Sequence, residues 1–185
     1  LSADLGALLQ KNKMFFTSAA SCTGGLLSQS IVSVPGSSAW FGCSFITYSN
    51  ISKQKILGVS KDTLKAFGAV SEEVVKEMVT GALDESHADL GIAISGIAGP
   101  GGGTDERPVG TVCVAWKLKG SETIKSTFLC PTVRTSCPEL RLPSAQGWKK
   151  GELGGRRTRW PEKARSPERR RKGRERLRTI AGFDH

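Results

Sequence analysis

The chain has 185 residues, enough for one domain with a sizeable core, and a formal net charge of +10. Residues 131–185 carry that charge, with 16 basic against 6 acidic residues, whereas residues 1–130 have 11 of each. Because residues 1–130 are neutral, the net charge is no argument that this part of the chain binds nucleic acid. The five cysteines lack a C-x-x-C pair, there are only two histidines, and the apolar runs fall well short of about 18 residues, which disfavours a zinc site and a membrane-spanning helix.

The first part of the chain predicts helices alternating with strands. Leucines at helical spacing indicate a helix over residues 3–12, and an apolar strand follows from Met14. A Ser-Cys-Thr-Gly-Gly turn then precedes a second helix, which Pro35-Gly36 ends. Aromatic and β-branched residues indicate a strand over 40–48, and two short helices are expected over 50–57 and 61–67.

The second part continues this alternation. Ser71 is a good N-cap for a helix that reaches about Ser86, with acidic residues in its first turn and one apolar stripe. A buried strand over 90–95, a Gly/Pro-rich loop over 96–108 and two strands joined by a turn follow. The expected bounds of these last strands are 110–118 and 123–130. Strands alternating with helices predict an α/β sandwich.

Composition changes abruptly after Cys130. Residues 131–185 are rich in Arg and Pro and poor in aliphatic residues, so they cannot bury enough apolar surface to offset their ordering entropy. We therefore expect a domain over 1–130 and a basic tail of low order over 131–185. An alternative function for this tail is sequence-independent binding of nucleic acid phosphates.

Ser21 is the first candidate for chemistry. It stands between a predicted strand and a helix start, where free backbone N–H groups converge, and two glycines follow shortly after it. This arrangement suits an activated serine beside an oxyanion site. The alternative is that Ser21 or Thr23 merely caps the helix.

A serine nucleophile needs a base, and neither His87 nor His185 lies in a motif. Lys53 and Tyr48 lie at the junction of a predicted strand and helix, where α/β folds collect their active sites. A desolvated lysine can accept a proton, and a tyrosine can relay it. The alternative is a solvated lysine and a packing tyrosine.

The segment from Ser95 to Thr104 has a glycine density that lets the backbone approach a ligand closely. It is neither a Walker A loop nor a Rossmann fingerprint, because no Gly-Lys-Ser/Thr follows and the next predicted element is a strand. It could cradle a phosphate, or it could be a flexible surface turn.

Six separated strings, read together and in order, resemble the CinA C-terminal domain family of nicotinamide-nucleotide amidohydrolases. They are Ala20-Ser21-Cys22-Thr23-Gly24-Gly25, Pro35-Gly36-Ser37-Ser38-Ala39, Thr47-Tyr48-Ser49-Asn50 with Lys53, Leu57-Gly58-Val59, Gly68-Ala69-Val70-Ser71-Glu72, and Gly96 to Gly103 leading to Pro108-Val109-Gly110-Thr111-Val112. The resemblance covers residues 1 to about 128. It implies a three-layer α/β/α sandwich around a mixed sheet.

The resemblance also implies an activity and a set of site residues. The family hydrolyses the carboxamide of nicotinamide mononucleotide to nicotinate mononucleotide and ammonia, which would make Ser21 the nucleophile, Lys53 the base and Tyr48 its partner. The implied substrate-binding residues are Thr23, Gly24, Gly25, Gly36, Ser37, Ser38, Ser95, Gly99, Gly101 and Gly102. No metal or organic cofactor is implied. The expected partner is a small nucleotide. A homo-oligomer is also possible, because a chain without the family's final helix would have one face of its sheet uncovered.

The start at Leu1 shows no signal-peptide pattern, and the cysteine count is odd. We therefore expect a reduced, cytoplasmic chain without a disulfide framework or membrane contact.

Two departures from the family pattern keep a second function open. Ala20 stands where the family usually has Glu, and residues 129–185 lack the family's Gly-Asp-Arg turn and its final arginine-bearing helix. A shifted reading frame at Pro131 would explain the tail, because codons for Pro-Thr-Val can contain those for Asp-Arg one register over. The alternative to an active enzyme is an inactive paralogue that only binds a nucleotide-like ligand.

Overall fold

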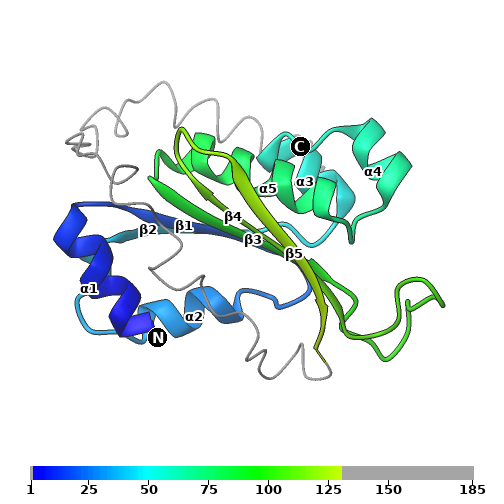
Figure 1. Cartoon of the computed structure of the whole chain (residues 1–185), viewed down its shortest axis with the longest axis horizontal. Helices are drawn as coiled ribbons and strands as arrows, with labels where there is room; N and C mark the ends of the chain where they lie inside the picture. The colour runs from blue at the N-terminus through cyan, green and yellow to red at the C-terminus, as the bar shows by residue number, and fades with distance from the viewer. Residues whose placement is uncertain (1, 131–185) are drawn as a thin grey trace, which may run out of the picture.

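In the computed structural model, which describes residues 2–130, a five-stranded sheet is covered by helices on both faces (Figure 1). The helices are α1 (Ser2–Asn12), α2 (Leu26–Val32), α3 (Asn50–Leu57), α4 (Lys61–Phe67) and α5 (Glu72–Ser86), with a short 3-10 helix at Ser37–Ala39. The strands are β1 (Phe16–Ala20), β2 (Phe41–Ile46), β3 (Leu90–Gly96), β4 (Thr111–Leu118) and β5 (Thr123–Leu129). The expected three-layer α/β/α sandwich around a mixed sheet is confirmed.

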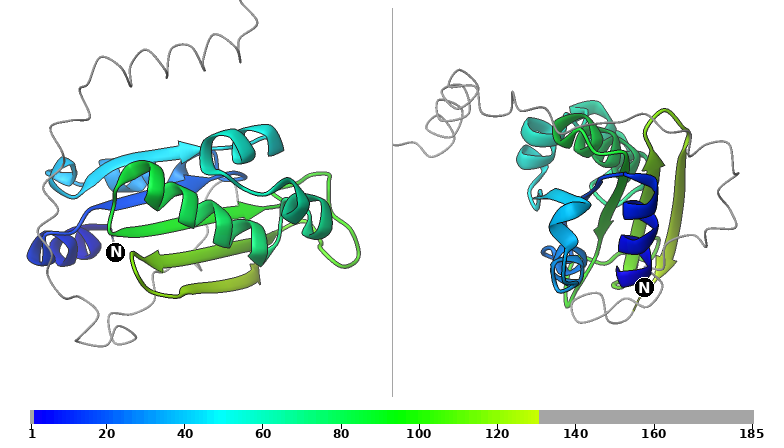
Figure 2. Two further views of the ribbon diagram at one scale, coloured as in Figure 1. Left: turned by 90° about the horizontal axis from the view of Figure 1, so that it is seen from above. Right: turned by 90° about the vertical axis from the view of Figure 1, so that its left-hand side faces the viewer.

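The strand order explains where a site can form. The order is β2-β1-β3-β4-β5, with β1 parallel to both of its neighbours and the pairs β3–β4 and β4–β5 antiparallel. After β1 the chain reaches β2 through α2, and after β2 it crosses to β3 through α3, α4 and α5. These two connections lie on opposite faces (Figures 1 and 2). The carboxyl end of β1 is therefore a topological switch point, the usual ligand position in such sheets.

The two faces are built from alternate residues of the same strands, as the period of two requires. Ile92 and Ile94 of β3 pack in the core beneath α1 and α2, while Ala93 packs in the core beneath α3, α4 and α5. In β4, Val114 and Trp116 belong to the first core. Small residues under α5 let this long helix lie close to the sheet.

Local sequence fixes the helix starts. Ser71 caps α5 by accepting a hydrogen bond from the N–H of Val74, and Ser49 and Ser60 cap α3 and α4 in the same way. The predictions of helices over 50–57 and 61–67 and of the long helix from Ser71 are confirmed. The predicted strand over 40–48 is shorter in the structure, where β2 leaves out Trp40 at its start and Thr47 and Tyr48 at its end.

The predicted low order of residues 131–185 lies outside the described residues. Within the described part of the chain, no helix has the length and apolar character needed to cross a membrane.

Candidate active site

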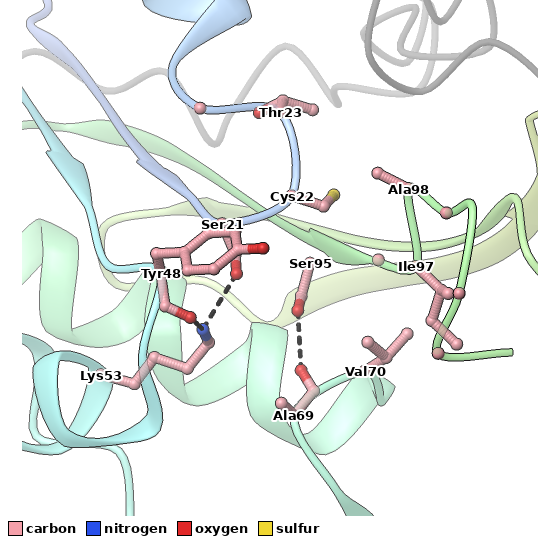
Figure 3. A pocket seen from close by; sticks show the side chains of 15 residues that line it. Ser21, Cys22, Thr23, Tyr48, Lys53, Ala69, Val70, Ser95, Ile97 and Ala98 are labelled. Carbon is pink, nitrogen blue, oxygen red and sulfur yellow. Dashed lines mark hydrogen bonds between the residues drawn. The ribbon is translucent and has the colours of Figure 1, made fainter.

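A pocket of about 640 Å³ opens at the carboxyl ends of β1, β2 and β3 (Figure 3). It is lined by the turn after β1, the end of β2 with α3, the connection between α4 and α5, and the glycine-rich loop after β3. The lining residues are Ser21, Cys22, Thr23, Gly24, Tyr48, Lys53, Ala69, Val70, Ser95, Gly96, Ile97, Ala98, Gly99, Gly101 and Gly102.

Ser21 and Lys53 meet at the base of this pocket. The Nζ atom of Lys53 lies 2.9 Å from Oγ of Ser21, although the two residues are 32 positions apart in the sequence. Lys53 is completely buried and Ser21 is 7% exposed. The topology brings them together, because Ser21 directly follows β1 and α3 directly follows the neighbouring parallel strand.

The Lys53 amine also contacts two main-chain oxygens. Nζ donates to the carbonyl of Thr47 at 2.7 Å and to the carbonyl of Tyr48 at 3.1 Å. Among residues 2–130, no carboxylate side chain lines the pocket. Burial lowers the pKa of Lys53 below its ordinary value, and the nearby Cys22 opposes this only in part. Burial thus shifts the protonation equilibrium of this amine toward the neutral form.

The helix-cap alternative for Ser21 and Thr23 does not describe the structure. The N-cap of α2 is Gly25, at φ 97°, and the helix has no side-chain cap. The hydroxyl of Ser21 is engaged by Lys53 instead, and the buried Oγ1 of Thr23 has no partner among the described residues. Ser21 is thus free of a capping role.

Cys22 is the other nucleophile type in the pocket. Burial raises its pKa to about 11, against smaller opposing effects from backbone N–H groups and from Lys53. The thiol therefore stays protonated near neutral pH and is a poor nucleophile compared with a thiolate.

Ser95 and Tyr48 are placed differently from the way their predicted roles suggest. Ser95 is 1% exposed, and its hydroxyl donates to the carbonyl of Ala69 at 2.7 Å, so it fixes the wall between α4 and α5. The carbonyl of Tyr48, not its hydroxyl, contacts Lys53. The Tyr48 side chain is 76% exposed.

The predicted glycines, together with Ser37 and Ser38, divide into residues that line the pocket and residues that do not. Gly24, Gly99, Gly101 and Gly102 line the pocket. Gly25, Gly36, Ser37 and Ser38 are not among the lining residues. Gly25 abuts Ile46, since a Cβ there would lie 2.8 Å from Cδ1 of that side chain.

Gly36, Ser37 and Ser38 lie outside this pocket, and their predicted role in substrate binding stays a prediction. They precede β2, which runs parallel to β1 from Phe41 beside Phe16, so they lie at the opposite end of the sheet from Ser21. Conversely, sequence reasoning missed six lining residues, which are Cys22, Ala69, Val70, Gly96, Ile97 and Ala98.

In residues 2–130, no three His, Cys, Asp or Glu side chains come together as a metal site. The arrangement is thus that of an α/β domain with a buried serine–lysine pair at a topological switch point. The chain belongs to the CinA C-terminal domain family, whose model matches residues 1–139.

Similar proteins support this assignment. The nicotinamide-nucleotide amidohydrolase PncC of Enterobacter agglomerans is 53% identical over 112 residues, which are 60% of this chain and 68% of that protein. The protein of the same name from Escherichia coli is 48% identical over 124 residues, or 67% of this chain and 75% of that protein.

A CinA-like protein of Akkermansia muciniphila is 52% identical over 118 residues, which are 64% of this chain but 28% of that relative's length. Among solved structures, a CinA superfamily protein from Escherichia coli matches with a TM-score of 0.66 and 38% identity, covering 69% of this chain and 74% of that one.

Proposed function

We propose that this chain hydrolyses the carboxamide of nicotinamide mononucleotide, with Ser21 as nucleophile and Lys53 as base. The observation that carries the proposal is the 2.9 Å contact between Lys53 Nζ and Ser21 Oγ inside a pocket. The substrate comes from the relatives named nicotinamide-nucleotide amidohydrolase at about half identity.

The contacts of the amine support the role of base. A neutral amine has two N–H groups and one lone pair, and its three neighbours are the Thr47 carbonyl, the Tyr48 carbonyl and the Ser21 hydroxyl. Carbonyl oxygens only accept hydrogen bonds, so they take both N–H groups. The lone pair is then left for the Ser21 O–H, the geometry that a general base requires.

The reaction then follows in balanced steps. Lys53 takes the proton of Ser21 while Oγ attacks the carboxamide carbon, and the proton passes to the nitrogen as the C–N bond breaks and ammonia leaves. Water then attacks the Ser21 ester after giving a proton to Lys53, which returns it to Oγ as nicotinate mononucleotide departs. The backbone N–H groups of Cys22 and Thr23, next to the nucleophile, are the proposed donors to the oxyanion.

Ammonia release by the purified chain, measured with nicotinamide mononucleotide, tests this proposal. Ser21→Ala should reduce kcat by about 10⁴-fold or more. Lys53→Arg keeps the positive charge but cannot deprotonate, so it should be as inactive as Lys53→Ala. Activity of the unaltered chain should rise with pH through an apparent pKa below about 10.4, because only the neutral amine accepts a proton.

Two matched controls accompany these variants. Lys55→Ala removes an exposed lysine of the same helix, and Ser30→Ala removes an exposed serine of α2. Both should retain activity. A Lys53→Arg variant as active as the unaltered chain would contradict the role of Lys53 as base.

The second candidate is the inactive paralogue that binds a nucleotide-like ligand. It is favoured by Ala20, which is 1% exposed directly before Ser21 where the family pattern has Glu. Binding of nicotinamide mononucleotide without any ammonia release would support this candidate against the first.

A further inference from the structure

The Tyr48 side chain has no structural task that explains its position. It is 76% exposed, the largest exposed fraction among the large apolar side chains of the described residues, and it nevertheless lines the pocket. Within residues 2–130 its hydroxyl has no hydrogen-bond partner, since its contact with Lys53 is made by the main chain. An aromatic ring held at a pocket without internal partners is available to a ligand.

The ring also stands in a suitable place. In Figure 3 it points from the end of β2 toward the middle of the pocket, in front of Ser21, while Val70 and Ile97 lie on the opposite side of the view. A flat ligand ring that entered between them would meet an aromatic face on one side and aliphatic side chains on the other. Its substituent would be directed at Ser21.

The charges of the pocket limit which ring it can hold. Among the described residues that line the pocket there is no Asp or Glu, and Lys53, their one basic side chain, is buried with its amine turned toward Ser21 and two carbonyls. A cationic ring would therefore find no carboxylate here. The quadrupole of the Tyr48 ring face is one feature of the pocket that attracts a cation.

We propose that Tyr48 is a specificity-determining residue whose ring face binds a cationic pyridinium ring and so selects N-substituted, positively charged carboxamides over their neutral counterparts. This inference rests on the proposed function for the orientation of the carboxamide toward Ser21. It assigns the role of Tyr48 to its ring and not to proton transfer by its hydroxyl.

A matched pair of ligands isolates the ring charge. Nicotinamide mononucleotide has a cationic pyridinium ring, whereas its reduced form has a neutral dihydropyridine ring and the same ribose and phosphate. Calorimetric titration of the Ser21→Ala chain with each ligand measures binding without turnover. We expect the cationic form to bind more tightly, by about 5- to 30-fold, the range for a partly desolvated cation–π contact.

Two Tyr48 variants, made in the same Ser21→Ala chain, then test the residue. Tyr48→Phe keeps the ring and should preserve the preference, whereas Tyr48→Leu keeps an apolar side chain and should abolish it by weakening the cationic form alone. Since the side chain is exposed, neither should lower the melting temperature, which serves as the folding control. A preference that survives in Tyr48→Leu would overturn the inference.

Kinetic measurements on the same Tyr48 variants with Ser21 intact distinguish the contribution of the Tyr48 ring from that of its hydroxyl. We expect Tyr48→Phe to retain kcat and Tyr48→Leu mainly to raise KM. A large loss of kcat in Tyr48→Phe with unchanged KM would overturn the inference in favour of a proton relay.

Failure of the proposed function gives a different result. A chain that releases no ammonia but prefers the cationic ring through Tyr48 would refute hydrolysis and keep this inference. A chain that releases ammonia but shows no Tyr48-dependent preference would support hydrolysis and refute this inference.

Discussion

The two faces of the sheet differ in the size of the side chains that pack on them. The face under α1 and α2 is filled by large side chains, among them Phe16, Trp40 and Trp116, whereas the face under α3, α4 and α5 presents Ala19, Ala93 and Ala115. The first face can adjust its bulky side chains, but the second brings backbone close to backbone. At Gly81 of α5 a Cβ atom would overlap the carbonyl oxygen of Leu57, the last residue of α3.

This difference shows how stability and site geometry are divided between the layers. Lys53 lies one helical turn before Leu57, so the packing of α3 on Gly81 sets the position of the amine. Ala69 and Val70 of the pocket wall also belong to the layer of α3, α4 and α5. The layer of α1 and α2 contributes buried apolar area and, directly before α2, the turn that carries Ser21.

Replacing one helical glycine in each layer should give the largest contrast. Gly81→Ala forces α3 away from α5, and a displacement of the amine by about 1 Å is expected to cost on the order of 10²-fold in kcat/KM. Gly6→Ala places a Cβ 2.7 Å from the Trp40 ring on the other face, a milder crowding because it meets a side chain and not a backbone carbonyl, and should leave kcat/KM of the folded protein nearly unchanged.

Urea unfolding and ammonia release measured on both variants check this contrast. Each variant should lose about 1–3 kcal/mol of unfolding free energy through overpacking, reduced by the better helix propensity of alanine. Equal loss of activity in the two would show that the layers are not separated in this way.

A second test uses the pH dependence of stability. Burial lowers the pKa of Lys53 in the folded state, so between that value and about 10.4 the unfolded chain binds more protons than the folded one. The unfolding free energy contributed by Lys53 therefore rises as pH rises through this window, by at most about 1.4 kcal/mol per pH unit.

Urea unfolding of the unaltered chain and of Lys53→Met at pH 7, 8, 9 and 10 measures this contribution as a difference. Burial raises the pKa of Cys22, Cys43 and Cys113, which gives the opposite slope above about pH 8.5. Because both proteins contain these thiols, the difference retains chiefly the Lys53 contribution. Parallel curves would mean that Lys53 is not desolvated in the folded protein.

We expect the smallest change in unfolding free energy from a substitution in the contact between α2 and the sheet. The hydroxyls of Ser18, Ser28 and Ser44 form a triangle of hydrogen bonds of 2.7–3.1 Å that joins α2 to β1 and β2. Ser28→Ala should cost about 0.5–1.5 kcal/mol of unfolding free energy, the usual contribution of such a bond, without changing KM. A marked rise in KM would show that this triangle also positions the turn at Ser21.

Much of the fold could be predicted from local patterns, whereas the pairing of Ser21 with Lys53 was implied only by the family resemblance. The helix from Ser71 followed from capping and apolar spacing, and the rule that sites gather where strands end singled out Tyr48 and Lys53 without showing that Lys53 contacts Ser21. Ala69 and Val70 were missed because small apolar residues in a connection have no periodic pattern, and it is contacts such as Ser95 to Ala69 that bring them to the pocket.

The positions of Gly36, Ser37 and Ser38 illustrate the limit of a linear motif. A motif shows that residues occur together in a family, but not which end of a sheet they occupy. Strand direction was the available signal, since residues that precede a strand parallel to β1 lie at the opposite end from residues that follow β1.

The two oxygens that hold the Lys53 amine belong to the main chain of Thr47 and Tyr48. Every amino acid supplies such an oxygen, so the side chain at position 48 can change through evolution or engineering while the base keeps its acceptors. In the proposals above, the ring of Tyr48 sets ligand preference, whereas its main-chain oxygen holds the Lys53 amine. A library varied at position 48 should accordingly yield proteins with altered substrates and an intact serine–lysine pair, which makes this residue the natural starting point for redesigning the pocket.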